Sequence, residues 1–160
     1  PNVDFYSGFV YSMLCPGQVT VAGPKTALDA AKADFTAAGA KVIPLAVSGG
    51  FHSPFMDEAA EKFREFLAGR DVGLIEIPVW ANCNAEPYGD DVWSLMETQI
   101  NHPVRFEQII RNMANTGVDT FIEVGPGQTL SKFVKKILPD ATTLHAETPE
   151  EIAAVKEVLA

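Results

Sequence analysis

The repeated change in the period of the hydrophobic pattern is the feature that most constrains the fold of this chain. Short runs rich in β-branched and other apolar residues have the character of strands, and segments with the 3–4 spacing of amphipathic helices separate them. We expect strands at residues 18–23, 41–47, 75–83, 120–124 and 142–146. Strands that alternate with helices in this way indicate an α/β fold with a largely parallel sheet.

The predicted helices begin or end at recognisable signals. We expect them from Pro24 to Gly39, from Ser53 to Gly69, from about Val92 to Ile100, from Phe106 to Thr116, after residue 128 and from Thr148. The clearest start is "TPEE" (148–151), a capping box with a proline at the first helical position. The helix after Ser53 carries apolar residues that we expect to face the core: Phe55, Ala59, Phe63 and Phe66.

Composition and charge exclude several classes of function. A chain of 160 residues is one ordinary domain or part of a larger one. Its formal net charge is −9, whereas binding to nucleic-acid phosphates needs clustered Lys and Arg, so we expect no nucleic-acid partner. No apolar run is long enough to cross a bilayer and no signal peptide opens the chain, so we expect no membrane partner. Cys15 and Cys83 form neither a CxxC pair nor a disulfide framework, which indicates a reducing, cytoplasmic location.

His52 is the candidate residue for proton transfer. It lies in "VSGGFHSPFM" (47–56), in the loop after a predicted strand. The loops at the carboxyl ends of strands are where α/β proteins bind their ligands. An imidazole can accept and return a proton near neutral pH. From the residues themselves two interpretations stay open: His52 is a catalytic base, or it is a histidine that caps or fills this corner.

The sequence predicts neither a metal nor a cofactor. No two of the three histidines, His52, His102 and His145, have the spacing of metal ligands, and the carboxylates near them form no set. We expect no chemical role for His102 or His145. The glycines of the 125–127 loop are expected to be structural, because they allow a tight turn.

Motifs that recur in a fixed order carry a resemblance to a known family. The motifs are "CPGQVTVAG" (15–23), "VSGGFHSPFM" (47–56), "PVWANCNAEPY" (78–88), "TQINHPVRF" (98–106) and "IEVGPGQTLSKFVKKI" (122–137). In this order and at these separations they resemble malonyl-CoA:acyl carrier protein transacylase and the related acyltransferase domains of fatty acid and polyketide synthases. The resemblance covers roughly residues 15–160.

The resemblance implies an activity and roles for three residues. The family transfers a malonyl group from coenzyme A to acyl carrier protein through an acyl-serine. His52 matches the catalytic histidine of the family. Gln99 matches the residue whose backbone carbonyl accepts the other imidazole N–H, although without the resemblance it would be taken for an exposed residue at a frayed helix end. Phe51 resembles the residue found in malonyl-selective members, where a bulky ring crowds a substituent on the malonyl carbon.

The resemblance also implies an incomplete active site. A transacylase carries its nucleophile on a GxSxG elbow, and the 160 residues contain no such motif. We expect the C-terminal part of the enzyme, with residues 15–47 in a small ferredoxin-like subdomain and 48–160 in a hydrolase-like large domain with a mainly parallel sheet. The expected partners are malonyl-CoA, acyl carrier protein and the missing N-terminal half that carries the serine. Without that half the chain is expected to be inactive, and the alternative is a non-catalytic fragment that acts as a binding or structural half.

Residues 1–14 stand apart from this resemblance. "PNVDFYSGFVYSML" resembles a short segment of citrate synthase, in which the aspartate matching Asp4 removes a proton from acetyl-CoA. The match covers only this segment, and the all-helical fold of citrate synthase conflicts with the strand and helix alternation of the rest. We therefore treat residues 1–14 as a separate N-terminal segment and assign it no function.

Overall fold

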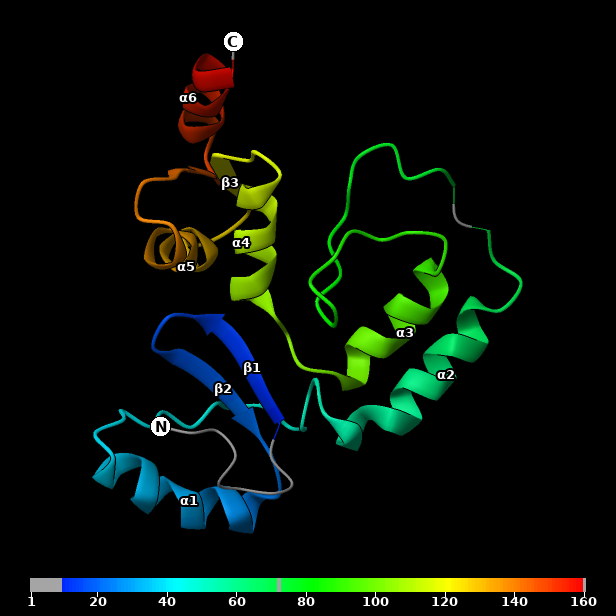
Figure 1. Cartoon of the computed structure of the whole chain (residues 1–160), viewed down its shortest axis with the longest axis vertical. Helices are drawn as coiled ribbons and strands as arrows, with labels where there is room; N and C mark the ends of the chain where they lie inside the picture. The colour runs from blue at the N-terminus through cyan, green and yellow to red at the C-terminus, as the bar shows by residue number, and fades with distance from the viewer. Residues whose placement is uncertain (1–9, 72, 160) are drawn as a thin grey trace.

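The computed structural model describes residues 10–71 and 73–159 of the chain. Helices and paired strands follow one another along it (Figure 1). In chain order the elements are β1 (Val10–Cys15), β2 (Gln18–Ala22), α1 (Lys25–Ala37), the 3₁₀ turn η2 (Pro54–Met56), α2 (Asp57–Leu67), α3 (Val92–Asn101), α4 (Phe106–Asn115), β3 (Thr120–Val124), α5 (Thr129–Ile137), β4 (Thr142–Ala146) and α6 (Pro149–Leu159). The α/β class predicted from the sequence is confirmed.

β1 and β2 form an antiparallel hairpin closed by Pro16 and Gly17. Proline fixes φ at the first turn position, and Gly17 has a φ of 76°, which glycine adopts without a steric penalty. β1 is also tied to the segment before α4. Met13 N donates to Val104 O at 2.9 Å, and Ser12 Oγ accepts from Val104 N at 3.1 Å. The hairpin therefore anchors the link between α3 and α4.

β3 and β4 form a parallel pair, in register from Thr120 and Thr142 to Val124 and Ala146. Parallel neighbours need a crossover connection, and α5 supplies it. α4 and α5 both pack on β1 (Figure 1). Between these elements lies an apolar cluster of buried residues: Cys15, Ile110, Phe133, Val134 and Ile137. This cluster joins the hairpin to the C-terminal elements of the described chain.

The predicted start of the last helix is confirmed. Glu151 Oε2 accepts from Thr148 N at 2.9 Å, and Glu151 N donates to Thr148 Oγ1 at 3.3 Å, as a capping box requires. α6 accordingly begins at Pro149. The same glutamate also contacts His145 on β4, because Glu151 Oε1 lies 3.1 Å from His145 Nδ1.

His145 has hydrogen-bond acceptors at both ring nitrogens. Nδ1 faces Glu151, and Nε2 lies 2.8 Å from Gly125 O and 3.9 Å from Glu147 Oε2. Only the imidazolium can donate from both nitrogens at once. The hydrogen bond with Glu151 raises the pKa of His145 above its ordinary value of 6.5. Hydrogen bonds from Thr148 N–H, His145 and Glu147 N–H lower the pKa of Glu151 to about 2.

We expect this pair to stabilise the folded chain most between pH 4.5 and 6.5, the ordinary pKa values of the two groups. Because the pKa of His145 is raised, its contribution is complete below 6.5 and is lost as pH rises through the folded-state value. Because the pKa of Glu151 is lowered, its contribution is complete above 4.5 and is lost as pH falls toward about 2. Urea unfolding of the parent chain and of His145→Ala across this range should give the largest difference in free energy of unfolding at about pH 5.5. A difference that does not vary with pH contradicts the prediction.

The prediction of strands at 41–47 and 75–83 is wrong for this structure. These segments belong to no sheet, apart from an isolated bridge between Trp80 and Pro87. Their apolar side chains are largely exposed, as at Leu45 (60%) and Ile77 (78%). A strand needs a neighbouring backbone along its length for its N–H and C=O groups. Among the described residues, the 75–83 segment has such a partner only around the bridge, where Tyr88 N donates to Val79 O and Ala81 N donates to Glu86 O. The described strands therefore form two two-stranded sheets, one antiparallel and one parallel, instead of one largely parallel sheet.

The helix predicted after Ser53 is present, but its expected buried face is wrong. Ala60 and Leu67 are buried, whereas Phe55 and Phe66 are 60% and 59% exposed. α2 packs against α3, so the position of that one neighbour decides which side chains of α2 are covered (Figure 1). The spacing of apolar residues correctly indicated a helix but not the direction of its partner.

Part of the sequence-based interpretation falls outside the described residues. Residues 1–9, and Asp4 with them, are not described, whereas residues 10–14 belong to β1. The domain boundaries predicted between 14 and 15 and between 47 and 48 stay predictions. None of the described helices combines the length and the apolar content needed to cross a bilayer.

Candidate active site

His52 lies at the corner between the extended segment that ends at Gly50 and the η2–α2 helix. Its backbone has a φ of 59°, in the left-handed region that few residues other than glycine adopt. Such backbone strain persists only where the surrounding structure holds it, and it is frequent at functional sites. The corner therefore holds His52 in an unusual conformation.

Residues on both sides of His52 fix this corner. Ser53 is completely buried, and its hydroxyl donates to Gly50 O while accepting from Phe55 N at 3.4 Å as the N-cap of η2. Gly50 has no room for a side chain, because an added Cβ would lie 2.8 Å from Phe55 Cδ2 and 3.0 Å from Ser53 Oγ. The tight contact between Gly50 and Ser53 thus bends the chain around His52.

The imidazole of His52 is held by the end of α3. His52 Nδ1 lies 2.8 Å from the backbone oxygen of Gln99. A carbonyl oxygen can only accept, so Nδ1 carries the hydrogen, and the neutral ring keeps a free lone pair on Nε2. In a continuing helix, Gln99 O would accept from the N–H of residue 103. That residue is Pro103, which has no N–H, so the carbonyl is left for the imidazole.

The end of α3 is also tied directly to α2. Asn101 Nδ2 donates to Asp57 Oδ1 at 2.8 Å, at the first residue of α2. Farther along the same pair of helices, Arg64 Nε and Glu97 Oε1 are 3.8 Å apart. Because α2 follows directly from the corner, these contacts keep His52 and Gln99 in one rigid unit.

The structure brings His52 and Gln99 together and leaves Phe51 at the surface beside them. The Phe51 side chain is 49% exposed. Its role in malonyl selectivity stays a prediction. The residues alone did not lead to the prediction that the Gln99 carbonyl accepts a hydrogen bond from the imidazole. The sequence does contain a signal for it, because Pro103, four residues after Gln99, has no N–H to pair with that carbonyl.

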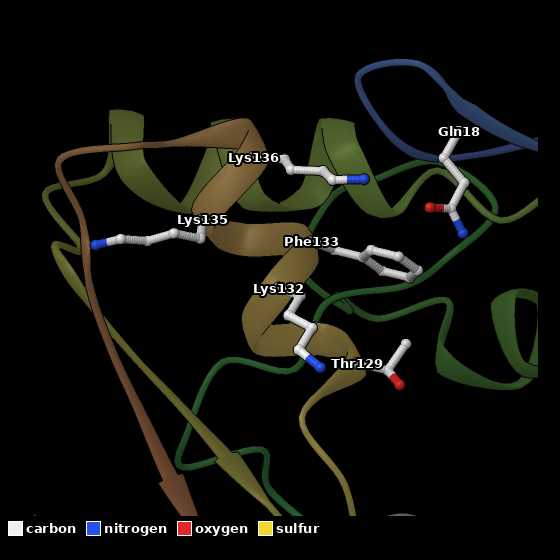
Figure 2. A pocket seen from close by; sticks show the side chains of 6 residues that line it. All are labelled: Gln18, Thr129, Lys132, Phe133, Lys135 and Lys136. Atoms are coloured by element: carbon white, nitrogen blue, oxygen red, sulfur yellow. The ribbon is translucent and has the colours of Figure 1, made fainter.

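A hollow of about 440 Å³ lies elsewhere, between the β1–β2 turn and α5 (Figure 2). The residues that line it are Gln18, Thr129, Lys132, Phe133, Lys135 and Lys136. Figure 2 shows the Phe133 ring and the Lys136 ammonium directed to the side of Gln18, whereas Lys135 points away. Lys135 Nζ donates to Ala141 O at 3.1 Å. Neither His52 nor Gln99 lines this hollow, so it is not part of the candidate site.

His102, in the "TQINHPVRF" motif, is the residue that follows the last turn of α3. His102 Nδ1 lies 2.9 Å from Thr98 O and 2.7 Å from Asn101 Oδ1. It thus occupies another of the carbonyls that the last helical turn leaves unpaired. Within residues 10–71 and 73–159, no group of three or more His, Cys, Asp or Glu side chains is arranged to hold a metal ion.

Comparisons with known proteins show which family the chain resembles. The acyl transferase domain family matches residues 8–154. Malonyl CoA-acyl carrier protein transacylase of Bacillus subtilis (strain 168) is 38% identical over 148 residues, which are 91% of this chain and 47% of the relative. The crystal structure of the transacylase of that name from Clostridium perfringens superposes with a TM-score of 0.90 at 33% identity, over 98% of this chain and 50% of the other. The structure of a type II polyketide synthase acyl carrier protein in complex with its malonyl-transacylase, PlMCAT:AntF, is also similar. Its TM-score is 0.86 at 31% identity, over 93% of this chain and 49% of the other.

The chain belongs to the acyl transferase domain family. It spans about half the length of the curated relatives and solved structures that it matches. The resemblance to malonyl-CoA:acyl carrier protein transacylases drawn from the motifs is confirmed at the level of the family.

Proposed function

We propose that this chain forms part of a malonyl-CoA:acyl carrier protein transacylase and supplies its catalytic base. The observation that carries the proposal is the contact of His52 Nδ1 with Gln99 O at 2.8 Å. An orienting acceptor at one ring nitrogen leaves the other free for proton transfer, which is the arrangement that nucleophilic acyl transfer needs. Gln99 acts through its backbone carbonyl, and Phe51, next in the chain to His52, borders the acyl group.

The proposed reaction has two half-reactions. In the first, His52 Nε2 accepts the proton of a serine hydroxyl as its oxygen attacks the thioester carbon of malonyl-CoA, and the proton then passes to the departing coenzyme A thiolate. In the second, Nε2 accepts the proton of the carrier-protein thiol as the sulfur attacks the malonyl-serine ester, and the proton returns to the serine oxygen. Throughout, Gln99 O holds the Nδ1–H, and it stabilises the imidazolium that forms in each half.

The serine of this reaction comes from polypeptide outside these 160 residues, which contain no GxSxG motif. The relatives are about twice as long as the part that this chain spans. We infer that the corresponding N-terminal half covers the exposed apolar side chains of segments 43–47 and 74–79: Ile43, Leu45, Val47, Leu74, Ile77 and Val79. We further propose that residues 48–160 form part of a hydrolase-like large domain with a mainly parallel sheet, beside a ferredoxin-like subdomain to which residues 15–47 contribute.

The proposed partners follow from the relatives. Their names include malonyl-CoA and acyl carrier protein, and PlMCAT:AntF is a complex of a transacylase with its carrier protein. For this chain we propose the same two partners and a role in fatty acid or polyketide synthesis. The proposed location is the cytoplasm, with which the free, buried thiols of Cys15 and Cys83 agree.

A first test measures the mass of each polypeptide before and after addition of malonyl-CoA. The sample is this chain alone, or this chain co-expressed with the N-terminal half of the Bacillus subtilis relative, which we expect to carry the serine. We expect the added half to gain one malonyl group and to pass it to acyl carrier protein only when this chain is present. If the two halves associate and no malonyl group is gained or passed on, the alternative holds: the chain is then a non-catalytic binding or structural half.

A further inference from the structure

The side chain of Gln99 makes a contact of its own beside the one made by its carbonyl. Gln99 Nε2 donates to the hydroxyl oxygen of Tyr88 at 2.7 Å, whereas Gln99 O faces His52 Nδ1 at 2.8 Å. Tyr88 belongs to the segment before α3 and precedes Gln99 by 11 residues. Three residues are therefore linked in the order Tyr88, Gln99, His52: the side chain of Gln99 contacts Tyr88, and its backbone carbonyl contacts His52.

Tyr88 is itself fixed in place. Its backbone N–H donates to Val79 O at 2.8 Å. Its ring packs against a buried apolar cluster of Ala81, Cys83 and Leu95. Burial raises the pKa of Tyr88, so the phenol stays protonated and neutral in the physiological range. The hydroxyl is thus a fixed hydrogen-bonding point against which the end of α3 can be held.

The end of α3 needs such a fixed point. The last carbonyls of a helix have no partner within the helix, and helix ends fray. Gln99 O is one of them, because Pro103 cannot donate to it. A side chain held at its far end restricts rotation of its own residue, so the contact with Tyr88 limits the directions in which the Gln99 carbonyl can point.

We propose that Tyr88 is a positioning residue, which through the side chain of Gln99 aims the Gln99 carbonyl at His52 and so keeps the imidazole in the Nδ1–H tautomer with Nε2 free. The proposal rests on the proposed function of His52, and it adds a residue that touches neither the substrate nor the imidazole. It makes the phenol hydroxyl, rather than the ring, the part of Tyr88 that matters.

The test removes only that hydroxyl and measures the tautomer of His52. Tyr88→Phe keeps the ring and its packing against the apolar cluster. Long-range ¹H–¹⁵N NMR of the chain reports which nitrogen of His52 carries the hydrogen, with the signal assigned by its loss in His52→Asn. We expect the parent chain to show Nδ1–H, and Tyr88→Phe to show a mixture of both tautomers. The Nδ1–H tautomer retained in full by Tyr88→Phe would overturn the proposal.

Two further variants separate positioning from a general loosening of the structure. Gln99→Ala keeps the carbonyl but removes the side chain, so it should shift the tautomer as Tyr88→Phe does, and the double variant should shift it no further. Asn112→Ala removes a different support of the same segment, the hydrogen bond from Asn112 Nδ2 to Ala85 O at 2.8 Å. It should leave the His52 tautomer unchanged, and a shift as large as that of Tyr88→Phe contradicts a specific role for Tyr88.

The kinetic consequence is measured in the enzyme reconstituted with its N-terminal half. We expect Tyr88→Phe to lower kcat about threefold to tenfold, the range of one neutral hydrogen bond, with KM unchanged. If His52→Asn leaves turnover intact, the proposed function fails whatever the tautomer shows. If His52→Asn abolishes turnover but Tyr88→Phe changes neither kcat nor the tautomer, only the role of Tyr88 fails.

Discussion

Malonyl transfer by the reconstituted enzyme falls by at least about 10³-fold when His52 is replaced, because the serine then lacks the base that removes its proton. The replacement needs care, since residue 52 has a φ of 59°. Asparagine tolerates this conformation better than alanine does, so His52→Asn tests the lost base with less disturbance of the backbone. The measurement is the initial rate of malonyl transfer to acyl carrier protein, at a temperature where both proteins are folded.

Two comparisons sharpen this prediction. Gln99→Ala should lower the rate far less than His52→Asn does, because the backbone carbonyl that holds the imidazole survives the change. His145→Ala is the matched control, since it removes a hydrogen-bonded histidine that does not contact Gln99. It should leave the rate unchanged at neutral pH. If His52→Asn and His145→Ala transfer malonyl equally fast, His52 has no role as the base.

The parts of the fold that local sequence decides were predicted well. The helix at Pro149 begins where its capping box predicts, because the Thr148 and Glu151 contacts span only three residues. The parallel strands at 120–124 and 142–146 also lie where their β-branched runs place them, with α5 as the connection. Each of these features depends on neighbours that are near in the chain or that follow directly after one crossover.

The parts that depend on distant partners were not predicted. The run from 41 to 47 has the composition of a strand, but a strand forms only beside another backbone, and none of the described segments pairs with it in a sheet. The prediction of the buried face of α2 was wrong for the same reason, because the position of α3 decides which side chains are covered. The sequence shows which residues are apolar and how they are spaced. Whether they are buried depends on what the chain packs against.

The candidate site shows the same division. The corner at His52 could be inferred from its glycines and from the Ser-Pro helix start, but its pairing with Gln99 came from the family resemblance. Pro103 was a local signal that the sequence offered, because a proline four residues after a helical carbonyl leaves that carbonyl unpaired. Tyr88 offered none. Its contact with Gln99 depends on how the segment before α3 folds back on that helix.

Gly50→Ala should lower malonyl transfer by about 100-fold while the chain stays folded, because small displacements of a catalytic group have effects of this size. The added Cβ would lie 2.8 Å from Phe55 Cδ2 and 3.0 Å from Ser53 Oγ, so the corner must shift. Since His52 lies between Gly50 and Ser53, that shift moves the imidazole relative to Gln99 O. NMR of the chain should therefore show loss of the His52 Nδ1–H to Gln99 hydrogen bond along with the loss of activity.

The neighbouring glycine provides the control. A Cβ on Gly49 meets only the tip of the Phe51 ring at 4.0 Å, which is ordinary contact. Gly49→Ala removes the same backbone freedom one residue earlier, so it should transfer malonyl at nearly the parent rate and keep the Nδ1–H signal. Equal losses in the two variants would mean that chain flexibility, and not the close packing of Gly50 against Ser53, sets the position of His52. A large loss in Gly50→Ala alone ties the rate to the geometry of this corner, because the two changes are chemically identical and differ only in what the new methyl group meets.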